Sequence, residues 1–353
     1  MEAIELLVAL AIILLAAELF TNGIEWFGHK LNLAEGVVGS VLAAVGTAMP
    51  ETMIPLVAIL LGGTGSSSES ADHIGVGAIL GAPFMLSTLA MFVTGVGILV
   101  FVRRRASGVT MTVDTRVMGL DIRYFFVAYA IAVAAAFVPA DMSWLRYVAV
   151  ALLLGIYAWY VKSHFEADTT VDATDLAPLR FHRVDRPGYR TDPSTPRLRV
   201  VNFQVLVAIA LIVGGALIFV DAVEHISRDA GLDPALLALI IAPIATELPE
   251  KFNSLIWVRQ GKDTLAIGNI TGAMVFQSCI PTAIGVLLAA GAWTITPQSL
   301  LSFASAGIAF ASTAVIFVPM ARRGTLTGRH LLVGGVFYLA YVALVVTHLA
   351  GLW

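Results

Sequence analysis

One short pattern occurs twice, as Thr47-Ala48-Met49-Pro50-Glu51 and as Thr246-Glu247-Leu248-Pro249-Glu250, each time inside a long apolar run. The match between the two copies extends back without a gap to Phe20 and Phe219. Duplicated apolar segments that are interrupted by proline and contain ionisable groups are typical of the binding sites of membrane transporters. The pattern therefore predicts a duplicated membrane protein whose function depends on these two stretches.

A second repeated string follows each copy after a short gap. Gly77-Ala78-Ile79-Leu80-Gly81-Ala82 corresponds to Gly268-Asn269-Ile270-Thr271-Gly272-Ala273. Glycines at four-residue spacing let membrane helices pack closely. Near the second copy the amides of Asn269 and Gln277 can offer an oxygen. The first copy has Ala78 and Leu86 at these positions, and its nearby polar group is Ser87.

The composition is that of a membrane protein. Hydrophobic residues make up 58% of the chain and charged residues only 13%, whereas a soluble domain averages about 25% charged residues. The apolar runs are roughly 20 residues long, the length of helix that crosses the hydrocarbon of a bilayer. We therefore expect an all-α, polytopic protein of the cell inner membrane or plasma membrane. The net charge of −3 argues against a nucleic-acid partner.

Ten transmembrane helices are predicted, and the basic residues give their orientation. Cytoplasmic loops retain Lys and Arg, and all but three of the 21 Lys and Arg residues fall on or beside the inner face when both termini are external. The helix that contains Glu51 then runs from inside to outside, and the helix that contains Glu250 runs the opposite way. The predicted helices are residues 3–20, 36–62, 74–102, 122–139, 144–162, 201–220, 234–258, 264–290, 297–320 and 331–351.

The opposite directions predict two inverted repeats of five helices each. Residues 1–162 form the first repeat and residues 201–353 the second. Residues 163–200, which are polar and contain four prolines, are expected to form a cytoplasmic linker. Inverted halves place their matched residues together near the middle of the bilayer.

Each copy of the pattern offers hard oxygen ligands for a cation. Proline lacks an N–H and clashes with the carbonyl four residues earlier, so each motif proline frees one backbone carbonyl. On a helix, the threonine of each copy shares a face with the glutamate four residues later. Such donors suit calcium or sodium. A carboxyl group out of water favours its protonated form, so the same site can exchange a metal ion for protons. The predicted ligands are Glu51, Glu250, Thr47, Thr246, the carbonyls of Gly46 and Ala245, Glu247, Gln277, Asn269 and Ser87.

At these residues the chain resembles a divergent member of the sodium/calcium exchanger membrane-region family, within the cation/calcium antiporter superfamily. The family's first string has the form Gly-Thr-Ser-Leu-Pro-Glu, which residues 46–51 and 245–250 resemble. Its second string has the form Gly-Asn-x-x-Gly-Ser-Asn, which residues 77–82 and 268–273 resemble. The resemblance implies calcium held by Glu51 and Glu250, with sodium at flanking hydroxyl and carbonyl sites.

Several positions depart from these strings. The serine of the first string is Ala48 in one copy and Glu247 in the other. The serines of the second string are also alanines, and the loss of these hydroxyls favours protons over sodium as the counter-ion. Lys251 lies four residues after Glu247, where the two side chains can pair on a helix. A structural ion pair and a role in transport are both open for these two residues.

The sequence predicts a secondary active cation antiporter, not an enzyme. The antiporter would exchange calcium, or another divalent cation, for protons or sodium by alternating access. Its partners would be inorganic cations and the lipid bilayer, and no resident cofactor is expected. A cation channel or passive pore is the alternative, which the inverted repeat disfavours. An intramembrane metal hydrolase is disfavoured because its histidine ligand spacing is missing. The sequence leaves the oligomeric state open.

Overall fold

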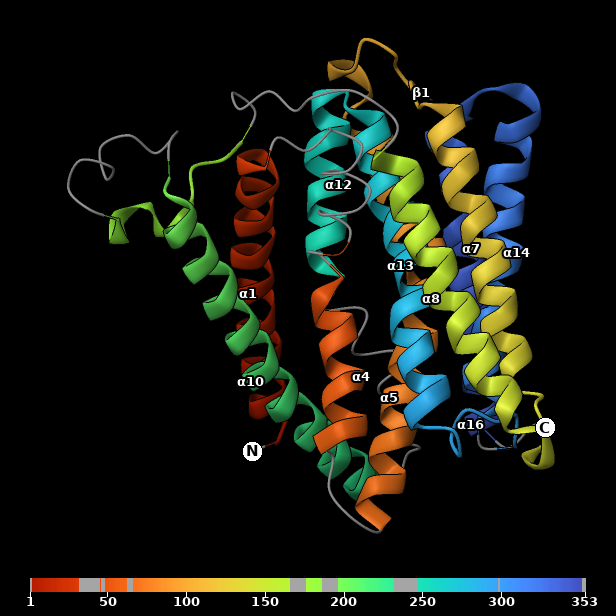
Figure 1. The fold of residues 1–353 in the computed structure, drawn as a ribbon. Coiled ribbons are helices and arrows are strands. Elements are labelled where there is room, and N and C mark those ends of the chain that lie inside the picture. The colour runs from red at the N-terminus through yellow and green to blue at the C-terminus, as the bar shows by residue number, and fades with distance from the viewer. Residues whose placement is uncertain are drawn as a thin grey trace.

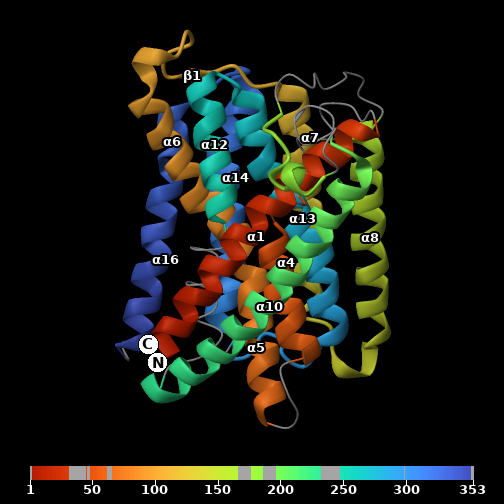
Figure 2. The same cartoon turned by 90° about the vertical axis from the view of Figure 1, so that its left-hand side faces the viewer.

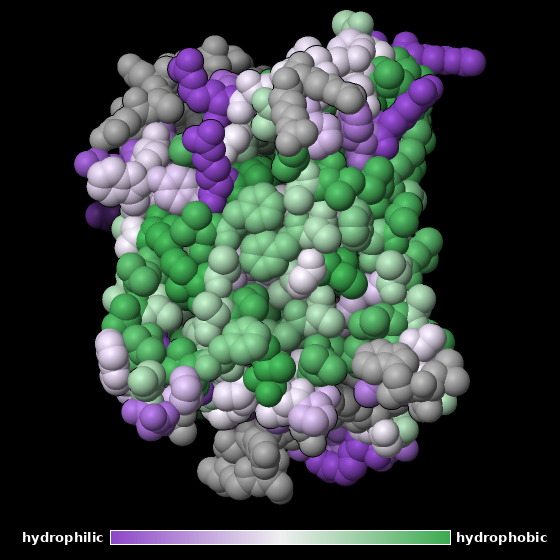
Figure 3. All heavy atoms as spheres, turned by 90° about the vertical axis from the view of Figure 1, so that its right-hand side faces the viewer, coloured by the Kyte–Doolittle hydropathy of each residue, from purple (hydrophilic) through white to green (hydrophobic). Residues whose placement is uncertain are grey.

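Helices make up almost all of the computed structural model, which describes residues 2–31, 45, 48–61, 66–165, 176–185, 196–231, 247–297 and 299–350. An α-helix satisfies its own backbone hydrogen bonds, which is what a chain in lipid requires. The long helices stand side by side (Figure 1), and a hydrophobic band separates two polar ends on the face shown in Figure 3. The chain is a multi-pass membrane protein.

In the first half of the chain, two helices are joined end to end through a π-helical turn, so that residues 71–100 form one membrane span. The elements are α1 (Glu2–Lys30), α4 (Met49–Leu61), α5 (Ser66–Met85), the π-helix η2 (Leu86–Ala90), α6 (Met91–Val100), the 3-10 helix η3 (Val102–Arg104), β1 (Thr110–Met111), α7 (Thr115–Ala135), the 3-10 helix η4 (Ala140–Met142) and α8 (Trp144–Phe165).

In the second half, two small strands and a short helix accompany the long helices. The elements are the 3-10 helix η6 (Arg180–Val184), α10 (Leu198–Ala230), α12 (Leu248–Gln260), α13 (Asp263–Leu288), α14 (Leu300–Arg323), β2 (Leu326–Thr327), α15 (Gly328–Leu331) and α16 (Val333–Leu349). Strands β1 and β2 pair antiparallel, Thr110 with Thr327 and Met111 with Leu326, and so join loops from the two halves.

Among the described residues, eight helices are long and apolar enough to cross a membrane. Helices α4 and α12, which contain the motif glutamates, have 13 residues each. They begin at Met49 and Leu248, directly at the motif prolines. The earlier parts of the predicted helices 36–62 and 234–258 lie largely outside the described residues.

Some predicted helix boundaries were wrong. Helix α7 begins at Thr115 and not at residue 122, because the carboxylate of Asp114 caps its N-terminus by accepting from Arg116 N at 2.8 Å and Val117 N at 3.3 Å. Helices α1 and α10 run ten residues past the predicted ends at residues 20 and 220, because the two helices pack against each other along their length.

Helix α13 lies at the centre of the molecule. It packs against α4, α5, α7, α8 and α12, and it shares with residues 71–100 the largest buried fraction of the eight spans. Helices α1 and α10 instead form a separate pair, which meets the remaining helices chiefly through α4. The pair lies at the left of the other helices in Figure 1 and crosses in front of them in Figure 2. The fold therefore divides into a packed core and a two-helix unit beside it.

Part of the predicted linker 163–200 is docked onto this two-helix unit. Trp26 Nε1 of α1 donates to Ala177 O at 2.8 Å, and Arg180 N donates to Asn22 Oδ1 at 3.0 Å. From α10, Gln204 Oε1 accepts from Phe181 N at 2.8 Å. Residues 176–185 therefore tie the ends of α1 and α10 together at the polar end of the pair.

Candidate cation-binding site

Helices α4 and α12 both begin near the mid-height of the molecule and run in opposite directions (Figure 1). Pro50 and Pro249 fall in their first turns, where the missing N–H of proline costs no hydrogen bond. The first turn of a helix leaves backbone N–H groups free and carries the positive end of the helix dipole. Each motif therefore places a glutamate where negative charge is stabilised.

The two motif glutamates are buried inside the protein. Glu51 is 4% exposed and Glu250 is 1% exposed, each in the first turn of its helix. The carbonyls of Gly46 and Ala245 and the hydroxyls of Thr47 and Thr246, which were predicted as ligands, lie outside the described residues. Buried carboxylates at membrane depth are costly and mark functional sites.

Glu247 and Lys251 form the ion pair expected from their spacing. Lys251 Nζ lies 3.1 Å from Glu247 Oε2, with side-chain exposures of 6% and 0%. With Glu51 and Glu250 ionised as well, three carboxylates and one ammonium group leave two negative charges. One divalent cation or two monovalent cations would offset that charge.

Gln277 extends from α13 to the beginning of α4. Its Nε2 atom donates to Ala48 O at 3.3 Å, and the same carbonyl accepts from Thr52 Oγ1 at 2.8 Å. Gln277 Oε1 is buried and has no hydrogen-bond donor among the described residues. An amide oxygen of this kind is a ligand that calcium and sodium accept.

The remaining predicted ligands differ in how the structure places them. Asn269 is fully buried on α13, about two helical turns before Gln277. Ser87 lies in η2, where its hydroxyl donates to Phe84 O at 3.0 Å and its carbonyl accepts from Ser312 Oγ at 2.7 Å. Ser87 is thus engaged with its own turn and with α14, and its role as a ligand stays a prediction.

Sequence reasoning missed another buried carboxylate, that of Asp121. Asp121 of α7 accepts from Thr271 Oγ1 at 2.6 Å and from Tyr160 OH at 3.0 Å, and it lies 3.4 Å from His164 Nε2. The predicted helix 122–139 left Asp121 in a loop. Recognising Asp114 as a helix cap would have moved the helix start upstream and placed this carboxylate inside the membrane.

The chain belongs to the sodium/calcium exchanger protein family, a family of membrane cation exchangers and not of enzymes. The family's sequence model matches residues 2–162 and 202–350, on either side of the linker.

Two relatives align with this chain over most of their length. A proposed antiporter, CaxA of Alkalimonas amylolytica, is 24% identical over 343 residues, covering 95% of both chains. The inner membrane protein YrbG of Escherichia coli (strain K12) is 23% identical over 286 residues, covering 81% of this chain and 79% of YrbG.

Two solved structures share the fold. The H+/Ca2+ exchanger CAX superposes with a TM-score of 0.76 at 14% identity, covering 98% of this chain and 82% of CAX. The sodium-calcium exchanger NCX_Mj superposes with a TM-score of 0.60 at 14% identity, covering 97% of both chains.

Proposed function

We propose that this chain is a secondary antiporter that exchanges calcium for protons by alternating access. The observation that carries the proposal is the burial of Glu51 and Glu250 at the starts of two oppositely directed half-helices, with Gln277 of α13 reaching the start of α4. Two carboxylates and an uncommitted amide oxygen form a donor set suited to calcium. The names of both structural neighbours also refer to calcium exchange.

Protons are the proposed counter-ion because this chain lacks hydroxyl groups where the family strings have serines. Ala48, Ala82 and Ala273 are buried and offer no side-chain oxygen. A carboxylate that has released calcium in a site shielded from water is stabilised by taking up a proton. Sodium is the other ion that the family resemblance allows.

The proposed architecture is two inverted repeats of five helices. In support, α4 and α12 run in opposite directions. In each half, among the described residues, one long helix precedes this half-length helix and three membrane-crossing helices follow it. The polar loops that contain Arg103, Arg104 and Arg105 lie at the opposite end from the start of α1 and the end of α16 (Figures 1 and 2). With basic loops inside, both termini are external.

In this architecture, α1 and α10 move as one unit past the core. The two helices contact each other more extensively than they contact any core helix. Residues 176–185 bond to both of them, which keeps their ends together. Movement of this unit across α4 would expose the motif glutamates first to one side of the membrane and then to the other.

Flux through proteoliposomes tests the proposal. Glu51→Gln and Glu250→Gln are each expected to reduce calcium uptake driven by a proton gradient by about a hundredfold or more, since even residues that only support a metal ligand are worth 10–100-fold. Glu5→Gln, the same change at an exposed position, serves as the matched control. Full uptake by the Glu51 or Glu250 variant would refute the site, and calcium current without gradient coupling would indicate a pore.

A further inference from the structure

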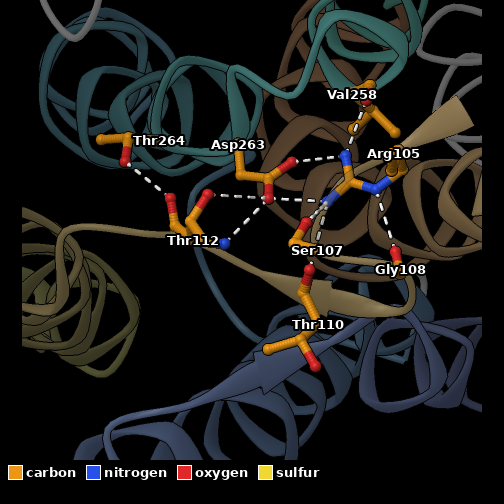
Figure 4. Close-up of polar contacts among 8 residues, drawn as sticks. All are labelled: Arg105, Ser107, Gly108, Thr110, Thr112, Val258, Asp263 and Thr264. Atoms are coloured by element: carbon orange, nitrogen blue, oxygen red, sulfur yellow. Dashed lines mark hydrogen bonds and ion pairs between the residues drawn. The ribbon is translucent and has the colours of Figure 1, made fainter.

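A fully buried ion pair joins the two halves of the chain at the cytoplasmic end of α12. Arg105 follows η3 in the first half, and Asp263 is the first residue of α13 in the second half. Nη1 lies 2.6 Å from Oδ1 and Nη2 lies 2.7 Å from Oδ2 (Figure 4). Both side chains are 0% exposed.

Every hydrogen-bonding nitrogen of the Arg105 guanidinium has a partner. Nη1 also donates to Val258 O at 2.6 Å, Nε donates to Gly108 O at 3.1 Å, and Nη2 donates to Thr110 O at 3.2 Å. Asp263 Oδ2 accepts in addition from Thr112 N at 2.8 Å. Burying two charges is costly unless their geometry and hydrogen bonds are complete, and here they are.

The pair fixes the connection between α12 and α13. The carbonyl oxygen of Val258, which accepts a hydrogen bond from Arg105 Nη1, belongs to the last turn of α12. Only Gly261 and Lys262 connect the two helices, and Gly261 has a φ of 77°, which favours glycine. One turn further from the connection, Ser254 Oγ donates to Ala266 O at 2.9 Å. The angle between α12 and α13 is thus set at this end.

The segment that carries Arg105 is itself held in place. Strand β1 pairs with β2, and Gly328 N donates to Val109 O at 2.9 Å. Arg105 therefore links the end of α12 and the start of α13 to a segment that is itself hydrogen-bonded to the loop after α14.

Helix α12 extends from this ion pair to the motif, so a tilt of the helix at the ion pair would displace the motif. Glu250 lies eight residues before Val258, about 12 Å along the helix. A tilt of about 5° at the connection would displace Glu250 by about 1 Å, which is enough to impair a ligand or catalytic group. Gln277, which reaches the start of α4, lies on the other arm of the same connection.

We propose that Arg105 is a positioning residue of the cation site, holding the angle between α12 and α13 so that Glu250 and Gln277 keep their places. The inference rests on the function proposed above. An ion pair that only stabilised the fold would change the unfolding temperature and leave the calcium affinity of the folded protein unchanged.

Calcium titration calorimetry on the purified full-length chain in detergent tests this role. Arg105→Gln and Asp263→Asn are expected to raise the Kd for calcium about tenfold or more, as losses of supporting partners do at metal sites. Arg105→Lys keeps the charge but not the two-pronged geometry and is expected to raise the Kd by a smaller factor. Arg180→Gln, which breaks an exposed pair with Glu18, should leave the Kd unchanged.

The outcomes are distinguishable. Absence of calcium binding by the unmutated chain would overturn both the proposed function and this inference. Calcium binding by the unmutated chain, with an unchanged Kd in folded Arg105→Gln and Asp263→Asn, would overturn only the inference. If those two variants fail to fold, the Kd of Arg105→Lys for calcium decides between the two roles. A higher Kd than that of the unmutated chain supports the positioning role, and an unchanged Kd contradicts it.

Discussion

At the scale of single residues, the side chain of Gln277 offers the sharpest test of the cation site. Its nitrogen is committed to Ala48 O and its buried oxygen has no donor among the described residues. Gln277→Leu removes that oxygen and is expected to weaken calcium binding about tenfold. Gln277→Glu keeps an oxygen in place and is expected to retain binding. Calorimetry on the purified variants measures both.

Ser278→Ala is the matched control for this prediction. The Ser278 hydroxyl is also buried on α13, but it donates to Met274 O of its own helix at 2.7 Å. We expect its loss to leave calcium affinity unchanged. Equal affinity in Gln277→Leu and the unmutated chain would remove Gln277 from the site.

The sequence predicted local relations between residues better than distant ones. The pairing of Glu247 with Lys251 was predictable because a helix brings residues four apart together. The ion pair of Arg105 with Asp263 was not, because the two residues lie in different halves and their contact depends on how loops meet. Asp121 was missed for a different reason, since its apolar neighbours did not show where α7 begins.

At the scale of elements, Gly215 lies at a close contact between α1 and α10. A Cβ atom at Gly215 would lie 2.7 Å from Ile13 Cγ1 and 3.3 Å from the Ala9 carbonyl oxygen, whereas a Cβ atom at Gly214 would meet nothing within 4 Å. Gly215→Leu is expected to destabilise the protein by about 1–3 kcal/mol through overpacking and to slow calcium uptake. Gly214→Leu should leave both near normal. Thermal unfolding in detergent and proteoliposome uptake measure the two effects.

Equal stability and uptake in the two glycine variants would contradict the close packing of this pair.

The existence of most helices was predictable from apolar runs, because lipid imposes a minimum length on them. Their polar ends were not, because the extensions of α1 and α10 depend on mutual packing. The extension of α1 is also stabilised by the docked residues 176–185, which no local pattern reveals.

At the scale of the whole molecule, the proposed topology predicts which loops face which side. Cysteine introduced at Ala106, an exposed position beside Arg105, should react with a membrane-impermeant maleimide only from the cytoplasmic side. Cysteine introduced at Asp141, exposed in η4, should react only from outside. The native Cys279 is buried and should give little background. Labelling of both positions from the same side would contradict the arrangement of α7 between them.

Glu51 and Glu250 are proposed to hold one cation between them, and this proposal can be checked by locating the ion. Long-wavelength diffraction from crystals grown with calcium would reveal the ion by its anomalous signal. We expect one peak at about 2.3–2.6 Å from carboxylate oxygens of both residues. A calcium ion bound by only one of the two glutamates, or bound elsewhere in the protein, would contradict it.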